Sequence, residues 1–260
     1  MGETPEISGD KAGGTPLPAQ PDLPTLGDVL DYCRPALPPV LLDDTGYALV
    51  HRVARGVPSA LSAFWGLEVR LGQAAARADI LWEINRRARR GRTLLAGTET
   101  APGPAGDILA THLQRDPVWQ ALQRFAADWE TDEGVAIRNI WMEADTAGCT
   151  DAAAADACRA APCVFWGAED DGTGADRRLL AMLPALARET FGLQVDPAPL
   201  AAIDAALPDD AYLFQRGAMG SRTEPVVRLC VQRLTPDAMV AWLDRIGWPG
   251  DTTAVADMLS

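Results

Sequence analysis

The stretch that decides the fold is Val135–Asp171, VAIRNIWMEADTAGCTDAAAADACRAAPCVFWGAEDD. It contains two strand-like runs, Ala136–Asp145 and Cys163–Gly167, which an alanine-rich insertion separates. In the first run apolar and polar residues alternate, which is the period of a strand with one buried face. A glycine turn follows, and a helical pattern begins near Ala175. This stretch therefore predicts a pair of strands followed by a helix.

The same order of two strands and a helix is predicted before and after that stretch. Alternating runs lie at Phe64–Gly72 and Ala78–Ile84 on one side, and at Tyr212–Met219 and Val226–Gln232 on the other. A strand pair cannot bury its apolar side alone, so the units have to stack behind outer helices. We predict an α+β fold with an antiparallel, barrel-like sheet of about six strands and helices on one face. Its three consecutive strand-strand-helix units span about 64–130, 136–206 and 211–248.

The first 24 residues are predicted to be a disordered Pro/Gly-rich tail, and residues 25–260 a single α+β domain. The tail has neither the basic nor the apolar region of a secretory signal. No apolar run reaches the ~20 residues that span a bilayer. We therefore expect a soluble, cytoplasmic protein without membrane contact. The preference for Arg over Lys, with much Ala, Gly and Pro, is typical of a GC-rich bacterial gene.

The net charge of −13 argues against nucleic-acid binding, because the chain has no overall positive field to hold phosphates. The dense run Arg86–Arg92 is a local exception. It is either a solvated loop or strand end balanced by acidic neighbours, or a site for an anion. Lys11 is the only lysine and lies in the tail, which excludes a Schiff base or P-loop lysine in the folded body.

The five cysteines are an odd number in a chain without a recognisable signal, so we expect no structural disulfide. Cys149, Cys158 and Cys163 cluster in the sequence, but they lack the close CxxC pair of most zinc sites. No histidine lies near them. We interpret them as small buried hydrophobic residues plus a loop thiol, and we expect no metal and no cofactor.

Local signals predict several helix boundaries. Thr25 is a candidate N-cap for a helix ending near Cys33, whereas Leu41–Val53 fits either a short helix or a turn with a strand. A helix from about Ala175 should be kinked or divided at Pro184, because proline removes a helical hydrogen bond.

The candidate site is the face of the sheet opposite the helices. One interpretation is that this is an ordinary solvated face on which opposite charges pair across neighbouring strands. If the sheet curls, the same side chains line a cleft, and Glu143 is the candidate catalytic base. The residues predicted on this face are Glu68, Arg70, Asp79, Glu83, Trp141, Glu143, Asp145 and Arg228, with either Gln215 or Arg216 joining them.

The predicted ligand-binding residues are a subset of that face together with one further tryptophan. The second tryptophan is included because a large indole can stack on a ligand. The set is Glu68, Arg70, Trp141, Asp145, Trp166 and Arg228.

No motif in the sequence dictates a reaction. The nucleophile elbow, dinucleotide, Walker A, HExxH and EF-hand patterns are absent, and His51 and His112 are the only histidines. We expect an accessory protein that binds a small polar molecule or a peptide in the cleft, with a protein as a further partner. An acidic scaffold protein without a pocket is the least specific alternative.

The consecutive strand pairs with outer helices resemble the αββα barrel of aromatic and peptide prenyltransferases. The resemblance covers about 64–248 and rests on architecture alone. It implies a metal-independent transferase in which Glu143 or Glu68 orients or deprotonates the acceptor. Arg70 and Arg228 would then hold the diphosphate. The chain departs from that family in having fewer hairpins and no lysine for the diphosphate.

Overall fold

The computed structural model describes residues 23–69, 76–131, 137–168, 175–220 and 226–259. The strands are β1 (Phe64–Val69), β2 (Ala78–Asn85), β3 (Ile137–Ala144), β4 (Cys163–Ala168), β5 (Tyr212–Ala218) and β6 (Val227–Gln232). The helices are α1 (Leu26–Cys33), α2 (Asp44–Ala54), α3 (Arg89–Ala96), α4 (Gly103–Arg115), α5 (Pro117–Thr131), α6 (Ala152–Ala160), α7 (Ala175–Phe191), α8 (Pro197–Ala205), α9 (Pro236–Arg245) and α10 (Thr252–Leu259). Short 3-10 turns are η1 (Arg34–Ala36), η2 (Ser59–Leu61) and η3 (Thr146–Gly148).

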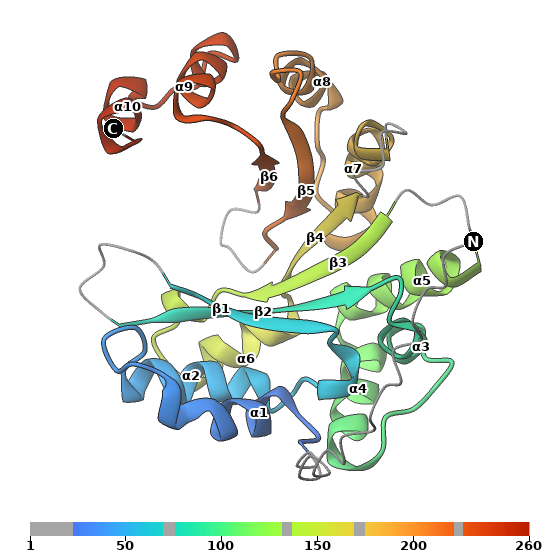
Figure 1. Cartoon of the computed structure of the whole chain (residues 1–260). Helices are drawn as coiled ribbons and strands as arrows, with labels where there is room; N and C mark the ends of the chain where they lie inside the picture. Colours follow the sequence, from blue (N-terminus) through green and yellow to red (C-terminus); the bar gives the residue numbers. More distant parts are fainter. Residues whose placement is uncertain (1–22, 70–75, 132–136, 169–174, 221–225, 260) are drawn as a thin grey trace, which may run out of the picture.

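The six strands form one antiparallel sheet in the order β1-β2-β3-β4-β5-β6, so each strand pairs with its neighbour in the chain. The sheet curls into a half-barrel, and the helices pack around its outer side (Figure 1). Helices α1, α2 and α6 lie next to the first strands, and α7 and α8 lie next to β4 and β5 (Figure 1). The predicted antiparallel sheet with helices on one face is confirmed.

The outer, convex face of the sheet is the hydrophobic core. Trp82 pairs with Met142, and Ile140 pairs with Trp166, and all four side chains are fully buried. Burying each large apolar side chain stabilises the fold by about 1.5–3 kcal/mol. Since strand side chains alternate, these residues also fix which side chains point to the inner, concave face.

Helix starts follow the local signals. At α1 the Thr25 Oγ1 accepts a hydrogen bond from the Asp28 N–H at 3.1 Å, and the Asp28 carboxylate accepts one from the Thr25 N–H at 2.9 Å. This capping box confirms Thr25 as the N-cap. The ambiguous segment 41–53 contains helix α2, capped by the Asp43 side chain, which accepts a hydrogen bond from the Gly46 N–H.

Two local predictions are met only in part. Residues 86–88 of the arginine run follow the end of β2 outside any helix, but α3 begins at Arg89 and is held by the burial of Leu94 and Leu95. A left-handed Gly97 ends that helix. Pro184 does not divide α7, which continues to Phe191. Leu183, Leu186 and Ala187 are buried, so packing outweighs the hydrogen bond that the proline removes.

The C-terminal helices α9 and α10 lie beyond β6, near α8 and away from α1 to α6 (Figure 1). Helix α9 is attached to α8, because the Arg245 guanidinium donates a hydrogen bond to the Ala206 carbonyl at 2.9 Å. Helix α10 has no buried residue. Among the described residues, none of the helices combines the length and apolar character that a membrane crossing requires.

The curl of the sheet generates a stability prediction at Gly217, where β5 passes close to β4. A Cβ atom at Gly217 would lie 2.4 Å from the Val164 carbonyl oxygen and 2.4 Å from the Phe165 ring. We expect Gly217→Ala to lower the free energy of unfolding by about 1–3 kcal/mol, as overpacking does, measured by urea denaturation. Gly148→Ala is the matched control, because a Cβ there meets nothing within 4 Å. Equal losses in both variants would contradict this account.

Candidate functional site

The curl brings the charged inner sides of three strands into one space. Arg228 on β6 lies 3.4 Å from a Glu68 oxygen on β1 and 3.8 Å from a Glu143 oxygen on β3. The first and last strands of the sheet therefore approach each other across its concave side. A cavity of about 180 Å³ opens there. It is lined by Glu68, Leu81, Trp141, Glu143, Phe165, Phe214, Gln215, Arg228 and Cys230.

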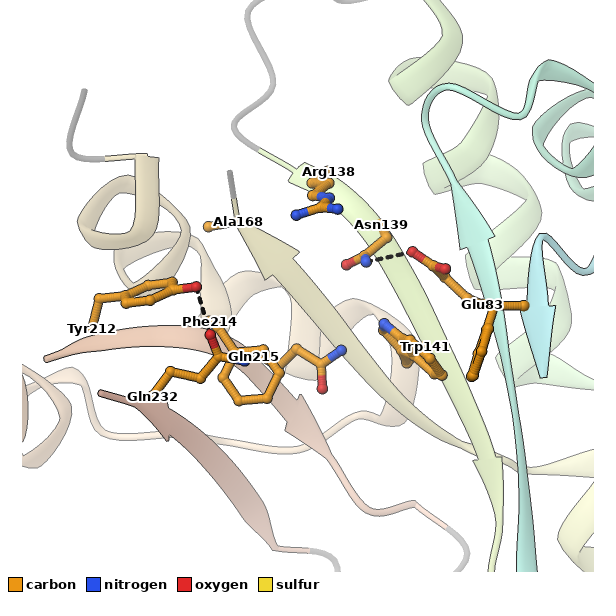
Figure 2. A pocket seen from close by; sticks show the side chains of 10 residues that line it. Glu83, Arg138, Asn139, Trp141, Ala168, Tyr212, Phe214, Gln215 and Gln232 are labelled. Carbon is orange, nitrogen blue, oxygen red and sulfur yellow. Dashed lines mark hydrogen bonds between the residues drawn. The ribbon is translucent and has the colours of Figure 1, made fainter. Parts of the chain in front are cut away.

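A second cavity, of about 330 Å³, adjoins the first on the same concave face (Figure 2). Both cavities share the side chains of Trp141, Phe214 and Gln215 as walls, so they are the two ends of one cleft. We call the end with Glu68, Glu143 and Arg228 the carboxylate end, and the other the amide end. The amide end is lined by Phe64, Glu83, Arg138, Asn139, Ala168, Tyr212 and Gln232 in addition to the shared walls.

Hydrogen bonds fix the side chains of the amide end. The Asn139 Nδ2 donates to Glu83 Oε1 at 2.6 Å, and the Tyr212 hydroxyl donates to Gln232 Oε1 at 2.7 Å (Figure 2). Trp141 is held edge-on against Phe64, with the ring centres 5.5 Å apart. The Asn139 Oδ1 is buried and accepts no hydrogen bond. This end of the cleft is therefore ordered and offers both amide groups and aromatic surface.

Two β-bulges shape the amide end. The register of β3 shifts between Ile137 and Asn139, and that of β5 shifts between Leu213 and Gln215. A bulge adds one residue to a strand and redirects the side chains beside it. As a result the adjacent pairs 138–139 and 214–215 both line the cavity, where strict alternation would place only one residue of each pair.

The carboxylate end holds a carboxyl group that resists ionisation. Burial raises the pKa of Glu143 to about 8, and the hydrogen bond with Asp145 and the negative charge of Glu68 act in the same direction. Arg228 opposes this rise, but at 3.8 Å it does not cancel it. Glu143 is only 4% exposed, so water screens these interactions little. These interactions therefore favour the protonated form of Glu143 at neutral pH.

Three carboxylates gather behind this end of the cleft. Asp79, Glu143 and Asp145 each offer an oxygen, and these oxygens lie within 4.8 Å of one another. Oxygen ligands of this kind suit Mg²⁺ or Ca²⁺, so among the described residues these could hold a divalent cation. One Asp79 oxygen already accepts a hydrogen bond from the Ala147 N–H at 2.7 Å.

Five of the residues predicted on this face, namely Glu68, Glu83, Trp141, Glu143 and Arg228, are walls of the cleft. Asp145 lies next to Glu143 and does not line either cavity. Trp166 lies on the opposite, helix-covered face and is fully buried. Arg70 lies outside the described residues.

The open choice between Gln215 and Arg216 is resolved by the register of β5. Gln215 lines the cleft, whereas Arg216 pairs with Trp166 on the helix side and is fully buried. Burial lowers the pKa of Arg216 to about 10, and one of its N–H groups donates to the Leu213 carbonyl at 2.8 Å.

Several cleft residues were not predicted from the sequence. Phe165 pairs with Trp141 across β3 and β4, so its place follows from the register between strands far apart in the sequence. Asn139, Trp141 and Glu143 are alternate residues of β3, so their side chains point to the same face of the sheet. The position of Asn139 could therefore have been predicted from the sequence. The positions of Arg138 and Phe214 in the cleft depend on the bulges, and that of Gln232 depends on the pairing of β5 with β6.

Comparison with known proteins adds no relative. No protein-family model, no curated protein and no solved structure matches this chain. The function therefore has to be argued from the chemistry of the cleft.

The raised pKa of Glu143 predicts a pH dependence of stability. Between its ordinary pKa of 4.5 and about 8, the unfolded chain has lost this proton and the folded chain keeps it. The free energy of unfolding should therefore fall as pH rises through that window, by up to about 1.4 kcal/mol per pH unit, and level off above it.

Urea denaturation across this pH range checks the prediction. In Glu143→Gln the fall should be absent, so the variant gains stability relative to the wild type as pH rises. Glu189→Gln, on an exposed side of α7, removes one carboxylate away from the cleft and serves as control. If wild type and Glu143→Gln show parallel pH curves, Glu143 does not hold its proton.

Proposed function

We propose that this chain is a binding protein for a small organic amine, which it holds in the cleft on the concave face of the sheet. The observation that carries the proposal is the convergence of Glu68, Glu143 and Arg228, from three different strands, on a cavity walled by Trp141. Rigid strands supply every one of these groups, so the site is formed before the ligand arrives.

The size of the cleft favours a small molecule over a protein partner. Its two ends measure about 180 and 330 Å³, and together they approach the size of ordinary small-molecule sites. The walls combine aromatic surface with a few fixed polar groups, which is the usual composition of such sites. A flat, solvated sheet face would have supported a scaffold without a pocket instead.

The charges at the carboxylate end favour a ligand that donates hydrogen bonds. Arg228 already faces both Glu68 and Glu143, and Asp145 adds a further carboxyl group behind them. An ammonium group placed among these oxygens gains charge-assisted hydrogen bonds and lowers the cost of ionising Glu143. The aromatic wall adds attraction for a cation over a ring face.

The amide end would receive the rest of the ligand. Trp141 and Phe214 provide aromatic surface between the two ends, and Gln215 and Asn139 provide neutral polar groups. A planar or apolar body carrying an amine at one end matches this order of side chains along the cleft.

Thermal denaturation with a matched pair of probes tests the proposal. Phenethylamine should stabilise the protein, and phenylpropionate, of similar shape and opposite charge, should not. A ligand at a hundred times its Kd adds about 2.7 kcal/mol to the free energy of unfolding, so the rise in Tm reports affinity. Binding should strengthen as pH rises toward about 8, because Glu143 then ionises more readily.

Variants separate the cleft from other surfaces. Glu68→Gln and Trp141→Ala should each weaken the phenethylamine effect about tenfold or more, since they remove a charged partner and an aromatic wall. Glu189→Gln should leave the effect unchanged, because it removes an exposed carboxylate of α7. Equal stabilisation by both probes, or an effect that survives both cleft variants, would overturn the proposal.

A second candidate function is acid–base catalysis by Glu143, favoured by its pKa of about 8 inside a cleft. In a transferase of the prenyltransferase kind, Glu143 would take a proton from the acceptor and Arg228 would contact the leaving diphosphate. The test is incubation with dimethylallyl diphosphate and an indole acceptor, followed by mass spectrometry of the products. A prenylated product that disappears in Glu143→Gln supports it, and no product from the wild type removes it without affecting the binding proposal.

A further inference from the structure

Two cysteine thiols meet beside the end of β3. Cys149 follows η3, and Cys158 lies in the last turns of α6. Their sulfur atoms are 3.4 Å apart. The eight residues between them in the sequence gave no reason to expect this contact, because α6 has to fold back for the sulfurs to meet.

Both thiols are oriented by the same acceptor. The Cys149 and Cys158 sulfurs lie 3.5 and 3.7 Å from the carbonyl oxygen of Asp145. The two side chains therefore point into one small space between the end of β3 and the helix. The two thiols can therefore approach each other by side-chain rotation, with the backbone in its present position.

Helix α6 is anchored at both ends, so the contact is part of the fold. At its start the Asp151 carboxylate accepts a hydrogen bond from the Ala154 N–H at 2.9 Å. At its end the Arg159 carbonyl accepts one from the Trp119 indole at 3.0 Å, and the Arg159 guanidinium donates to the Arg52 carbonyl at 3.0 Å. These contacts keep Cys158 on α6 close to Cys149.

We propose that Cys149 and Cys158 form a reversible intramolecular disulfide, a modification site behind the carboxylate end of the cleft. A disulfide bond is about 2.05 Å long, so the sulfurs have to approach by a further ~1.3 Å. Rotation of the two side chains about their Cα–Cβ bonds moves sulfur atoms by this amount without unfolding α6. The proposal does not depend on the amine-binding function.

The oxidant is a small-molecule disulfide such as oxidised glutathione. Cys158 is the more exposed of the two, so its thiolate attacks the oxidant and expels one glutathione thiolate. Cys149, 8% exposed, then attacks the Cys158 sulfur and expels the second. Two protein thiols become one disulfide, and the oxidant becomes two molecules of glutathione, which take up the two protons.

The surroundings of the pair set the rate of this exchange. Burial raises the pKa of both thiols, that of Cys158 to about 12, and the negative charge of Asp145 acts in the same direction on both. Since the thiolate is the attacking species, oxidation should be slow at neutral pH and faster as pH rises. The groups that face the pair are Asp79, Asp145, Asp151 and Cys163.

The test uses the reduced full-length protein incubated with oxidised glutathione. Free thiols are then alkylated, and the digest is mapped by mass spectrometry. The expected result is one cross-link between the peptides that carry Cys149 and Cys158, with the loss of two hydrogen atoms from the intact mass. Dithiothreitol should reverse it completely.

Variants identify the partners. Cys149→Ser and Cys158→Ser should each abolish the cross-link, whereas Cys33→Ser, at a partly buried thiol of α1, should leave it unchanged. In Cys149→Ser a mixed disulfide with glutathione should accumulate on Cys158, because the resolving thiol is missing.

Two results would overturn the proposal. One is a wild-type protein whose Cys158 carries glutathione, or stays reduced, without any cross-link to Cys149. The other is a cross-link from either thiol to Cys163, whose sulfur lies 3.7 Å from the Asp145 carboxylate. The mapping of the wild-type chain decides between these outcomes even if a serine variant fails to fold.

Discussion

Burial of one face of the sheet is the constraint on which the rest of the structure depends. Trp82, Met142 and Trp166 are too large and too apolar to remain in water, so helices have to cover the face on which they lie. Alternation then sends every second side chain to the concave side. Because the sheet also curls (Figure 1), Arg228 on the last strand reaches the carboxylates of Glu68 on β1 and Glu143 on β3.

The concave side of the sheet differs from the core in that it buries ionisable side chains close to one another. Glu143 is buried beside Asp145 and Glu68, and the opposing charge of Arg228 is shared with Glu68. Such a group destabilises the fold when it ionises, and it persists because the convex packing holds the strands in place. Strongly perturbed carboxyl groups in clefts are typical of functional sites, which is why the cleft, and not the acidic surface, carries the proposed function.

Asp145 connects the two sites that we propose. Its side chain contacts Glu143 at the carboxylate end, and its carbonyl oxygen accepts from both thiols of the cysteine pair. Oxidation would remove both of those donors at once. Asp145 is also one of the groups that raise the pKa of Glu143. The oxidation of the cysteine pair and the ionisation of Glu143 therefore both involve contacts of Asp145.

Local patterns in the sequence predicted the strands, the three hairpins and the capped helix starts. They also predicted that the face with Glu68, Glu143 and Arg228 is polar. Alternation and capping depend on residues close together in the chain, so the sequence alone reveals them. They could not supply the contact of Arg228 with Glu68, which are 160 residues apart, or the contact of Cys149 with Cys158. Nor could they locate the bulges that bring Arg138 and Phe214 into the cleft. Those features depend on register, curvature and helix packing, which are decided only when distant segments bury surface against one another.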